Sequence, residues 1–269
     1  MSSGTFNPDP RGNRLADWAW EHVGQKKLLL LRGSDEITDQ VIRAFPGTMK
    51  VDLYPRYAPA WTHRLCLGSE ADPVPTLDVL QRVLTLRTTE DLDAVIALDF
   101  YYRPPFNGGS GLAPTPVGSL VNAIKYQALG EVEVAQAGQR LTALLSEVVM
   151  THPWFRSIDL VLAVPGHDSD QVATSVRIGV TVARHAEVPC MSPKSRRPGF
   201  RKSVKNMTDQ ERAELLDYFV FERDLSGLAV LVVDDVFHTG YTMRGVARAA
   251  RLAGASTVLG LTAARNWRR

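Results

Sequence analysis

Asp234 and Asp235 stand side by side directly after an apolar run that spans residues 230–233. A run of this composition predicts a strand that is buried on both faces, so the two carboxylates lie where that strand ends. Carboxylate oxygens accept hydrogen bonds from sugar hydroxyls and coordinate hard divalent cations. The pair therefore indicates a site for a hydroxylated ligand, a divalent cation, or both.

The residues that follow the two carboxylates predict an anion site. Gly240 lies between Thr239 and Thr242, and apolar residues at helical spacing predict a helix over residues 243–253. The free N–H groups and the positive dipole end of such a helix favour a phosphate, and glycine lets the backbone approach it closely. Carboxylates beside a phosphate cradle together indicate a sugar phosphate. A strand–helix turn with incidental acids is the alternative interpretation.

The stretch from residue 230 to residue 242 resembles the binding signature for phosphoribosyl pyrophosphate (PRPP) in type I phosphoribosyltransferases. In that signature an apolar strand runs into Asp-Asp and a Thr-Gly-x-Thr turn, as it does here. The resemblance implies that Asp234 and Asp235 are the catalytic carboxylates, which hold the ribose hydroxyls and a Mg²⁺ ion. It also implies that PRPP is bound, with its 5′-phosphate at 239–242, by Val236, Phe237, His238, Thr239, Gly240, Tyr241 and Thr242.

The elements around this stretch repeat its pattern of strand, loop and helix. A second apolar run over residues 158–165 predicts another buried strand, which leads through a polar loop into a helix over residues 171–184. Such alternation predicts a parallel sheet with helices on both faces, whose ligands bind beyond the carboxyl ends of the strands. The loops expected to gather at that edge are 165–170, 194–205 and 234–242.

The loop after the strand at 158–165 is assigned a role by the same resemblance. It would bind pyrophosphate, with Mg²⁺ bridging the leaving group and the ribose oxygens. An acid such as Asp168 is unfavourable beside pyrophosphate unless a metal intervenes, and a solvated acidic turn is an equal alternative. The residues expected to bind PRPP here are Pro165, Gly166, His167, Asp168 and Ser169.

The stretch 194–205 carries six basic residues and no acidic one. Lys194, Arg196 and Arg197 are expected to contribute to PRPP binding, as part of a mobile lid that neutralises pyrophosphate. The basic residues around Phe200 would equally suit backbone contact and base stacking with single-stranded nucleic acid. A solvated loop is the third interpretation.

A narrower resemblance covers residues 113–266, which are similar to phosphoribosyltransferases of the competence protein F (ComF) type. The zinc ribbon of paired cysteines that begins ComF proteins is absent, and the loop after Pro165 lacks their basic pattern. The resemblance implies the type I phosphoribosyltransferase fold, an α/β doubly wound and mainly parallel sheet with a hood. It rests on the hood segment Asn122-Ala123-Ile124-Lys125-Tyr126, on Leu162-Ala163-Val164-Pro165, on Gln210 and Arg212, and on Ala264-Arg265.

The chain is expected to divide into an N-terminal α/β region of unknown role over residues 1–112 and a phosphoribosyltransferase-like domain over residues 113–269. The segment 101–118 is rich in proline and glycine, which predicts a linker or a long loop. Within the N-terminal region we expect a loose tail over residues 1–14 and a short helix over residues 15–22.

Composition sets the remaining limits. The chain has 269 residues and a formal net charge of +2, which is too small to indicate a nucleic-acid partner by itself. No apolar run approaches the roughly 20 residues needed to span a bilayer, and the N-terminus lacks a secretory signal pattern. Cys66 and Cys190 form neither a metal-binding pair nor a disulfide framework. A cytoplasmic protein without membrane contact is expected.

These features predict a Mg²⁺-dependent phosphoribosyltransferase of nucleotide metabolism, which transfers the phosphoribosyl group of PRPP to a nitrogen acceptor such as a nucleobase and releases pyrophosphate. The alternative is a non-catalytic ComF-like module that uses the PRPP site in DNA uptake, nucleic-acid handling or nucleotide sensing. A hydrolase of a ribosyl phosphate is a third hypothesis. PRPP is the expected small-molecule partner, single-stranded nucleic acid a candidate second partner, and a homodimer a candidate assembly.

Overall fold

The computed structural model describes most of the chain. The predicted site residues His167, Asp168 and Ser169 lie outside the described residues, as does Phe200. The described residues are 6–24, 26–68, 70–104, 111–126, 130–166, 172–197, 202 and 204–267.

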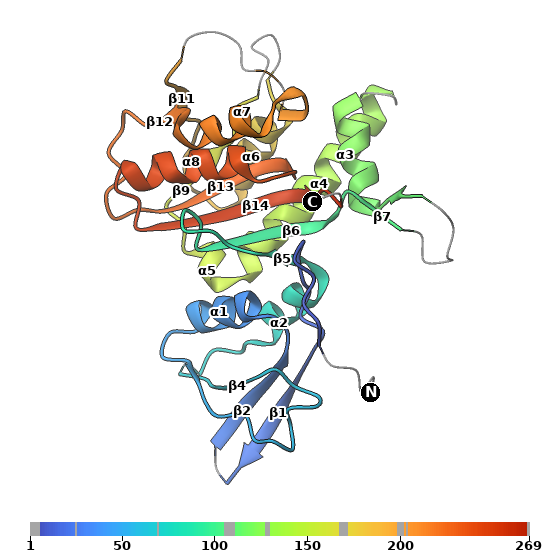
Figure 1. Ribbon diagram of the computed structural model, residues 1–269, viewed down its shortest axis with the longest axis vertical. Coiled ribbons are helices and arrows are strands. Elements are labelled where there is room, and N and C mark those ends of the chain that lie inside the picture. The colour runs from blue at the N-terminus through green and yellow to red at the C-terminus, as the bar shows by residue number, and fades with distance from the viewer. Residues whose placement is uncertain are drawn as a thin grey trace.

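A six-stranded sheet forms the centre of the larger part of the molecule (Figure 1). In spatial order its strands are β10 (Cys190–Met191), β9 (Leu160–Ala163), β13 (Ala229–Phe237), β14 (Thr257–Arg265), β6 (Ala94–Phe100) and β5 (Leu84–Leu86). Neighbouring strands run parallel except for β5, which is antiparallel to β6. Val232 of β13 pairs with Leu162 of β9 on one side and with Gly260 of β14 on the other, so β13 is central. The predicted α/β fold class with a mainly parallel sheet is confirmed.

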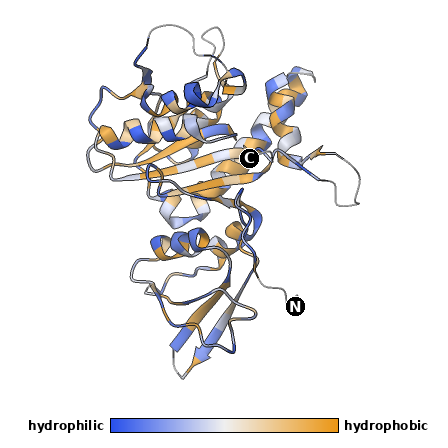
Figure 2. Cartoon of the chain, in the orientation of Figure 1, coloured by the Kyte–Doolittle hydropathy of each residue, from blue (hydrophilic) through white to orange (hydrophobic). Residues whose placement is uncertain are grey.

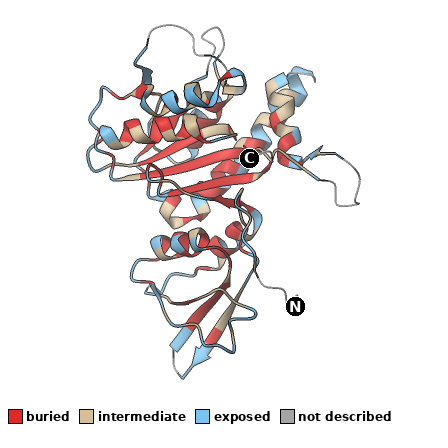
Figure 3. Ribbon diagram, viewed as in Figure 1, coloured by how far each residue is buried: buried red, intermediate tan, exposed pale blue. Residues whose placement is uncertain are grey.

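Helices cover both faces of this sheet, and the side chains of β13 show how they are held. Leu231 and Val233 point into a core formed mainly with three helices, whereas Val230 and Val232 point into the opposite core beneath a fourth. Alternate strand residues face opposite sides, so a strand covered on both faces requires an unbroken apolar run. Figure 3 shows these strands buried along most of their length. The three helices are α3 (Pro116–Tyr126), α4 (Glu131–Thr151) and α6 (Thr174–His185), and the fourth is α8 (Tyr241–Leu252).

The N-terminal part builds a second sheet of four antiparallel strands. Leu29, Leu31 and Leu65 of this sheet pack against Ile37 and Val41 of a covering helix. Figure 2 shows that apolar and polar residues both occur along these strands and the covering helix. The strands are, in spatial order, β1 (Asp17–Val23), β2 (Lys26–Arg32), β4 (His63–Cys66) and β3 (Met49–Lys50), and the helices are α1 (Asp35–Ala44) and α2 (Val74–Arg82).

The predicted helix over residues 15–22 is wrong, because Asp17–Val23 forms strand β1. Trp18 and Trp20 both pack against the core under α1 and α2, which is the spacing of two that a strand gives. β1 pairs along its whole length with β2, across a turn at Gly24 whose φ is +60°. Pairing with a neighbouring strand therefore decides the conformation of a segment too short to show a clear period.

The large sheet begins well before residue 112, where the sequence places the domain boundary. β5 and β6 both belong to that sheet, and β6 ends at Phe100. The segment rich in proline and glycine that follows contains two short paired strands, β7 (Tyr102–Arg103) and β8 (Ala113–Pro114), and leads directly into α3. Residues 84–100 are thus part of the same sheet as β13.

The tail expected to be loose is packed against the sheet in its described part. Asn13 and Thr85 exchange two backbone hydrogen bonds of 2.8 and 2.7 Å, so this segment lies along the edge strand β5. Leu15, which follows it, is 2% exposed. The expectation fails because a polar composition does not prevent a segment from pairing with an open sheet edge.

Short elements complete the described structure. They are α5 (Pro153–Arg156), β11 (Lys194–Ser195), the 3₁₀ helices η1 (Val204–Asn206) and η2 (Glu214–Asp217), α7 (Asp209–Ala213) and β12 (Phe219–Val220).

None of the helices in the described structure is both long enough and apolar enough to cross a membrane.

Candidate functional site

Asp234 and Asp235 lie where β13 leaves the core. The four residues 230–233 are fully buried, whereas the two carboxylates are half-buried. The strand nevertheless continues to Phe237, which pairs with Arg265 of β14. The carboxylates are therefore fixed on a rigid strand at the carboxyl edge of the sheet, the edge at which ligands of such sheets bind.

A glycine starts α8 directly after this strand. Gly240 is the N-cap residue with φ of +80°, a backbone conformation that side chains with a Cβ rarely adopt. A Cβ at this position would come within 2.4 Å of the ring of Phe237. The first N–H groups of an α-helix have no carbonyl to bond within the helix, and the dipole makes this end positive. The predicted geometry for a bound anion is therefore present.

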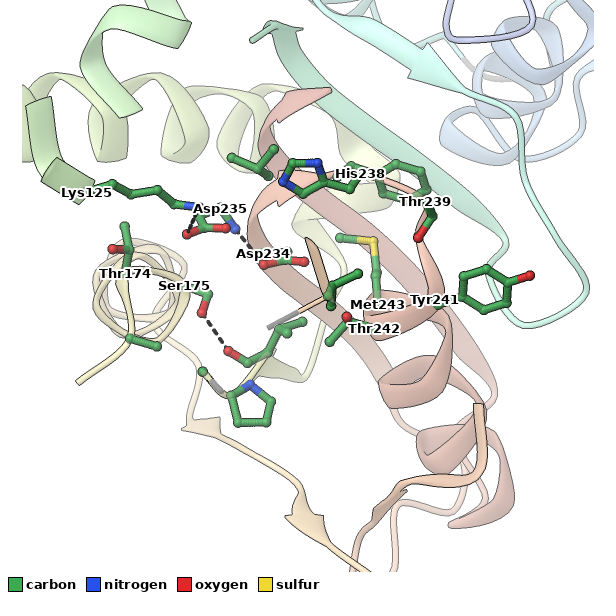
Figure 4. Close-up of a pocket in the computed structure, with 18 of the residues that line it drawn as sticks. Lys125, Thr174, Ser175, Asp234, Asp235, His238, Thr239, Tyr241, Thr242 and Met243 are labelled. Atoms are coloured by element: carbon green, nitrogen blue, oxygen red, sulfur yellow. Dashed lines mark hydrogen bonds and ion pairs between the residues drawn. The ribbon is translucent and has the colours of Figure 1, made fainter. Parts of the chain in front are cut away.

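A cavity of about 460 Å³ joins the carboxylates to this helix start (Figure 4). Its walls are the loop between β13 and α8, the residues after β9, the first turn of α6 and the last turn of α3. The volume lies within the range usual for small-molecule sites. The lining residues are Lys125, Tyr126, Val164, Pro165, Gly166, Val172, Ala173, Thr174, Ser175, Val204 and residues 234–243.

The structure brings together all the described residues that the sequence predicted on the two main loops. Both carboxylates, residues 236–242, Pro165 and Gly166 line the same cavity. Thr174 and Ser175 line the cavity too, although the sequence pattern did not predict them as site residues. The feature of the sequence that could have indicated them is a pair of neighbouring hydroxyl residues near the start of a predicted helix. Such a position is typical of anion contacts.

The first turn of α6 is the second helix start at the cavity. Ser175 donates a hydrogen bond of 2.6 Å from Oγ to the carbonyl of Val164, which ties the helix to the end of β9. Thr174 also lines the cavity (Figure 4). Two positive helix ends, those of α6 and α8, thus open on one space beside the carboxylates. Such an arrangement suits a ligand with an anionic group at each end.

Lys125 connects the hood helix α3 to the carboxylate pair. Its Nζ lies 2.8 Å from Oδ2 of Asp235, and the two side chains are only 27% and 17% exposed. The backbone N–H of Asp235 donates a 2.8 Å hydrogen bond to Oδ1 of Asp234. Figure 4 shows Lys125 extending from α3 to the carboxylate. One of the two negative charges is therefore neutralised by the protein itself.

The hood is packed closely on the end of β6. A Cβ at Gly118 of α3 would lie 2.0 Å from the carbonyl oxygen of Tyr101, so only a glycine permits this approach. The hydroxyl of Tyr101 bonds to Asn122 of the same helix. Burial raises the pKa of Tyr101 above its ordinary value, and the neighbouring Tyr126 adds to the effect. Tyr101 is therefore a neutral hydrogen-bond donor that holds α3.

The structure does not bring Lys194, Arg196 and Arg197 into the described lining of the cavity. Lys194 forms a 2.6 Å ion pair with Glu222, and Arg197 forms one of 2.7 Å with Glu214. Arg196 donates from Nε to the carbonyl of Phe219 at 3.3 Å. These contacts follow from the pairing of β11 with β12, which holds the start of the basic stretch away from the carboxylates. Its binding of pyrophosphate or single-stranded nucleic acid stays a prediction.

The donor set fits a magnesium ion that arrives with a phosphorylated ligand. Mg²⁺ is usually held by one or two carboxylates together with phosphate oxygens and water. Asp234 and Asp235 supply such oxygens, and both are fixed on β13. Among the described residues, no group of three or more His, Cys, Asp or Glu side chains could hold a metal ion. The residues therefore suit a shared Mg²⁺ better than a cation caged by protein alone.

Comparison with known proteins finds a distant likeness in structure. No protein-family model matches the chain, and no curated protein matches it. The chain is distantly similar in structure to a purine phosphoribosyltransferase from Pyrococcus horikoshii Ot3, with a TM-score of 0.32 and 16% sequence identity. The alignment covers 46% of this chain and 69% of that one. A likeness of this extent describes no function, which has to be inferred from the side chains of the site.

Proposed function

We propose that this chain is a PRPP-binding phosphoribosyltransferase, which uses Mg²⁺ to transfer the phosphoribosyl group to a nitrogen acceptor such as a nucleobase and releases pyrophosphate. The observation that carries the proposal is a single cavity lined by the Asp234–Asp235 pair and by the glycine-capped start of α8. An anion site and a site that accepts hydrogen bonds from hydroxyls, side by side, match the two halves of ribose 5-phosphate.

Each part of PRPP has a counterpart in the lining. The 5′-phosphate is assigned to the first turn of α8, where Thr239 and Thr242 add hydroxyl donors. The ribose hydroxyls are assigned to the two carboxylates of β13. The pyrophosphate is assigned to the space near Gly166 and the first turn of α6, whose dipole again favours an anion. The acceptor would then approach from the side of the hood.

In this reaction the protein mainly positions the reacting groups and stabilises the charge that develops. Displacement of pyrophosphate at the anomeric carbon passes through a state in which positive charge develops on the ribose ring, as in glycoside hydrolysis. The fixed carboxylates of Asp234 and Asp235 orient the ring and stabilise that charge. When bound, Mg²⁺ supplies positive charge to the departing pyrophosphate.

A relationship to the ComF type is the finer part of the proposal. The hood segment that carries this resemblance, residues 122–126, forms the last part of α3. Lys125 of that segment reaches the carboxylate pair, and Tyr126 lines the same cavity. This placement supports a role for the segment at the acceptor side of the site.

Release of pyrophosphate tests the proposal directly. The protein supplied with PRPP, Mg²⁺ and each common nucleobase in turn should release pyrophosphate with at least one acceptor. Asp235→Asn should lower that rate by at least about 100-fold, the usual effect of losing one electrostatic contact in the transition state. Asp209→Asn, which alters a carboxylate of α7 that is 93% exposed, should leave the rate unchanged.

Two other outcomes would replace the proposal. Release of ribose 5-phosphate and pyrophosphate without any acceptor would identify a hydrolase. Bound PRPP that never releases pyrophosphate with any acceptor would identify a non-catalytic module.

A further inference from the structure

The end of β14 holds the last residue of β13 and the first residue of the following loop from outside the cavity. Arg265 donates from Nη1 to the backbone carbonyls of Phe237, at 3.2 Å, and of His238. The backbone N–H of Asn266 donates to the same Phe237 oxygen at 2.9 Å, and Nδ2 of Asn266 lies 2.8 Å from Nδ1 of His238. Neither Arg265 nor Asn266 belongs to the described lining of the cavity. Both therefore contact the loop without facing the space for a ligand.

Holding these two carbonyls fixes the direction of the following N–H groups. In a planar trans peptide the carbonyl oxygen and the next N–H point in opposite directions. The carbonyl of Phe237 shares a plane with the N–H of His238, and the carbonyl of His238 shares one with the N–H of Thr239. Bonds to Arg265 thus turn these two N–H groups away from Arg265. Residues 238 and 239 line the cavity, so the contact controls donors next to the proposed phosphate position.

Arginine suits this task better than lysine. Its guanidinium is planar and presents several donors in a fixed geometry, whereas a lysine ammonium has no preferred plane. The side chain of Arg265 is buried, with 7% exposure, so its orientation is fixed by packing. Burial, together with the nearby charge of Arg11, lowers the pKa of Arg265 to about 10, so the guanidinium remains charged at neutral pH.

The N-terminal segment contacts Trp267, the residue that follows Arg265 and Asn266. The guanidinium of Arg11 lies 3.6 Å from the ring centroid of Trp267, the residue after Asn266. Asp9 holds that guanidinium through two hydrogen bonds of 2.8 and 2.7 Å. Trp267 in turn packs edge-on against Phe100 at the end of β6, with ring centroids 4.8 Å apart. The residues 9–11 therefore lie against the last described residues of the chain.

This N-terminal segment is itself anchored to the sheet. The backbone N–H of Asp9 donates to Oδ1 of Asn13 at 2.7 Å, and Nδ2 of Asn13 donates to the carbonyl of Asp9 at 2.9 Å. Asn13 pairs with Thr85 of β5 through its backbone. A chain of direct contacts thus connects the edge strand β5, through Arg11 and Trp267, to the residues that hold the loop.

We infer that Arg265 is a positioning residue for the phosphate-binding loop, and that residues 9–13 of the N-terminal segment keep it in place through Trp267. The part of this inference that concerns phosphate binding rests on the proposed function. The part that concerns how firmly the loop is held in one conformation is independent of the proposed function. The N-terminal segment is thereby assigned a role at the site, although it contributes no described residue to the lining.

Hydrogen exchange of the backbone amides in residues 237–242, measured without ligand, tests the inference independently of the proposed function. Arg265→Lys should raise exchange in this segment about tenfold, the expected effect of losing one hydrogen bond to a charged group, and Arg11→Ala should raise it by a smaller factor. Arg251→Lys is the matched control, because Arg251 also donates to two backbone carbonyls, those of Ala255 at 3.3 Å and Ser256 at 2.7 Å. That control should leave exchange in residues 237–242 unchanged.

The second measurement is the affinity of the same folded variants for PRPP with Mg²⁺, determined by calorimetry. Arg265→Lys should weaken binding about tenfold, while Arg251→Lys should not change it. Unchanged exchange in residues 237–242 for both Arg265→Lys and Arg11→Ala would overturn the inference. Increased exchange combined with a wild-type protein that does not bind PRPP would leave the positioning role standing and reject the proposed function.

Discussion

Lys125 determines the charge that a ligand meets at the carboxylate pair. Its ammonium group neutralises Asp235 at a distance of 2.8 Å, in a place where both side chains are largely shielded from water. A divalent cation or a ribose hydroxyl that binds to Asp235 must share that carboxylate with Lys125 or displace it. The residue therefore couples the hood helix to whatever occupies the site.

Replacement of Lys125 by methionine tests this coupling. Lys125→Met keeps the length of the side chain but leaves Asp235 without its counter-ion, which should lower the free energy of unfolding by about 1–3 kcal/mol. A divalent cation can then supply the missing charge, so millimolar Mn²⁺ should raise the melting temperature of the variant more than that of the wild type. Lys202→Met, which removes a surface ion pair with Glu211, is the control. An equal response to Mn²⁺ in all three proteins would show that Lys125 and a cation do not compete.

Gly240 is the residue whose backbone shapes the anion site. Gly240→Ala should destabilise the protein by about 1–2 kcal/mol because of its positive φ, and should weaken PRPP binding because the loop must move away from the ring of Phe237. Gly227→Ala has the matched backbone strain, with φ of +77°, but no atom within 4 Å of its added Cβ. Denaturant unfolding and calorimetry together separate the two effects. Equal affinity for PRPP in both variants would argue against a phosphate at the start of α8.

At the scale of elements, the start of α8 and the hood α3 meet because β13 and β6 end at the same edge of the sheet. The hood packs closely there on the end of β6, where Gly118 approaches the carbonyl of Tyr101. Any side chain at this position would push the whole helix outward. The distance between Lys125 and Asp235 therefore depends on a residue that lies two turns earlier in α3.

Gly118→Ala should displace α3 and so break the ion pair at its far end. The added Cβ meets backbone rather than a flexible side chain, so the expected loss of stability is about 1–3 kcal/mol. Gly138→Ala in α4 is the matched helical control, since nothing lies within 4 Å of its added Cβ and alanine favours a helix by about 1 kcal/mol. Chemical denaturation should therefore move the two variants in opposite directions. A Gly118→Ala protein as stable as the wild type would contradict the close docking of α3.

The sequence predicted elements whose conformation is decided locally. The run into Asp234 and the turn at Gly240 carry their signals in adjacent residues, and the structure has strand, loop and helix in the expected order. The strand continues to Phe237 and the helix begins at Tyr241, so the loop between them is shorter than expected. Strand β1 was not predicted, because the alternation of Trp18 and Trp20 is too short a pattern to indicate a strand. The segment is extended because it pairs with β2. The Lys125–Asp235 pair was not predicted either, since it joins segments far apart in the chain. Contacts of this kind depend on tertiary packing, which a local pattern does not contain.

At the scale of the whole molecule, α5 joins the two sheets. Trp154 packs against the core of the large sheet and against the core under the N-terminal sheet. His152, directly before α5, is completely buried, and neither ring nitrogen has a hydrogen-bond partner among the described residues. Burial lowers the pKa of His152 from 6.5 to about 3, so the imidazole is neutral in the folded protein at neutral pH.

The buried His152 should make the fold sensitive to acid. In the unfolded chain the imidazole takes up a proton near pH 6.5, whereas in the folded protein it resists protonation down to about pH 3. Its contribution to stability is therefore complete above pH 6.5 and is lost as the pH falls from there toward 3. At pH 5 the loss should be about 2 kcal/mol relative to neutral pH.

Leucine at position 152 should remove this part of the pH dependence. Urea unfolding of His152→Leu between pH 7.5 and pH 5 should show a change in the free energy of unfolding smaller than that of the wild type by about 2 kcal/mol. His22→Leu, at an exposed position of β1, should behave like the wild type. Parallel pH profiles for His152→Leu and the wild type would show that His152 is not held neutral in the fold.

The thermal stability of the protein with PRPP, with and without Mg²⁺, tests most directly whether the cavity between α3, α6 and α8 is a PRPP site. PRPP with Mg²⁺ should raise the melting temperature of the wild type, while PRPP alone should have little effect. The double variant Asp234→Asn/Asp235→Asn should lose the response although it remains folded. A melting temperature that PRPP and Mg²⁺ together leave unchanged in the wild type would contradict the proposed function.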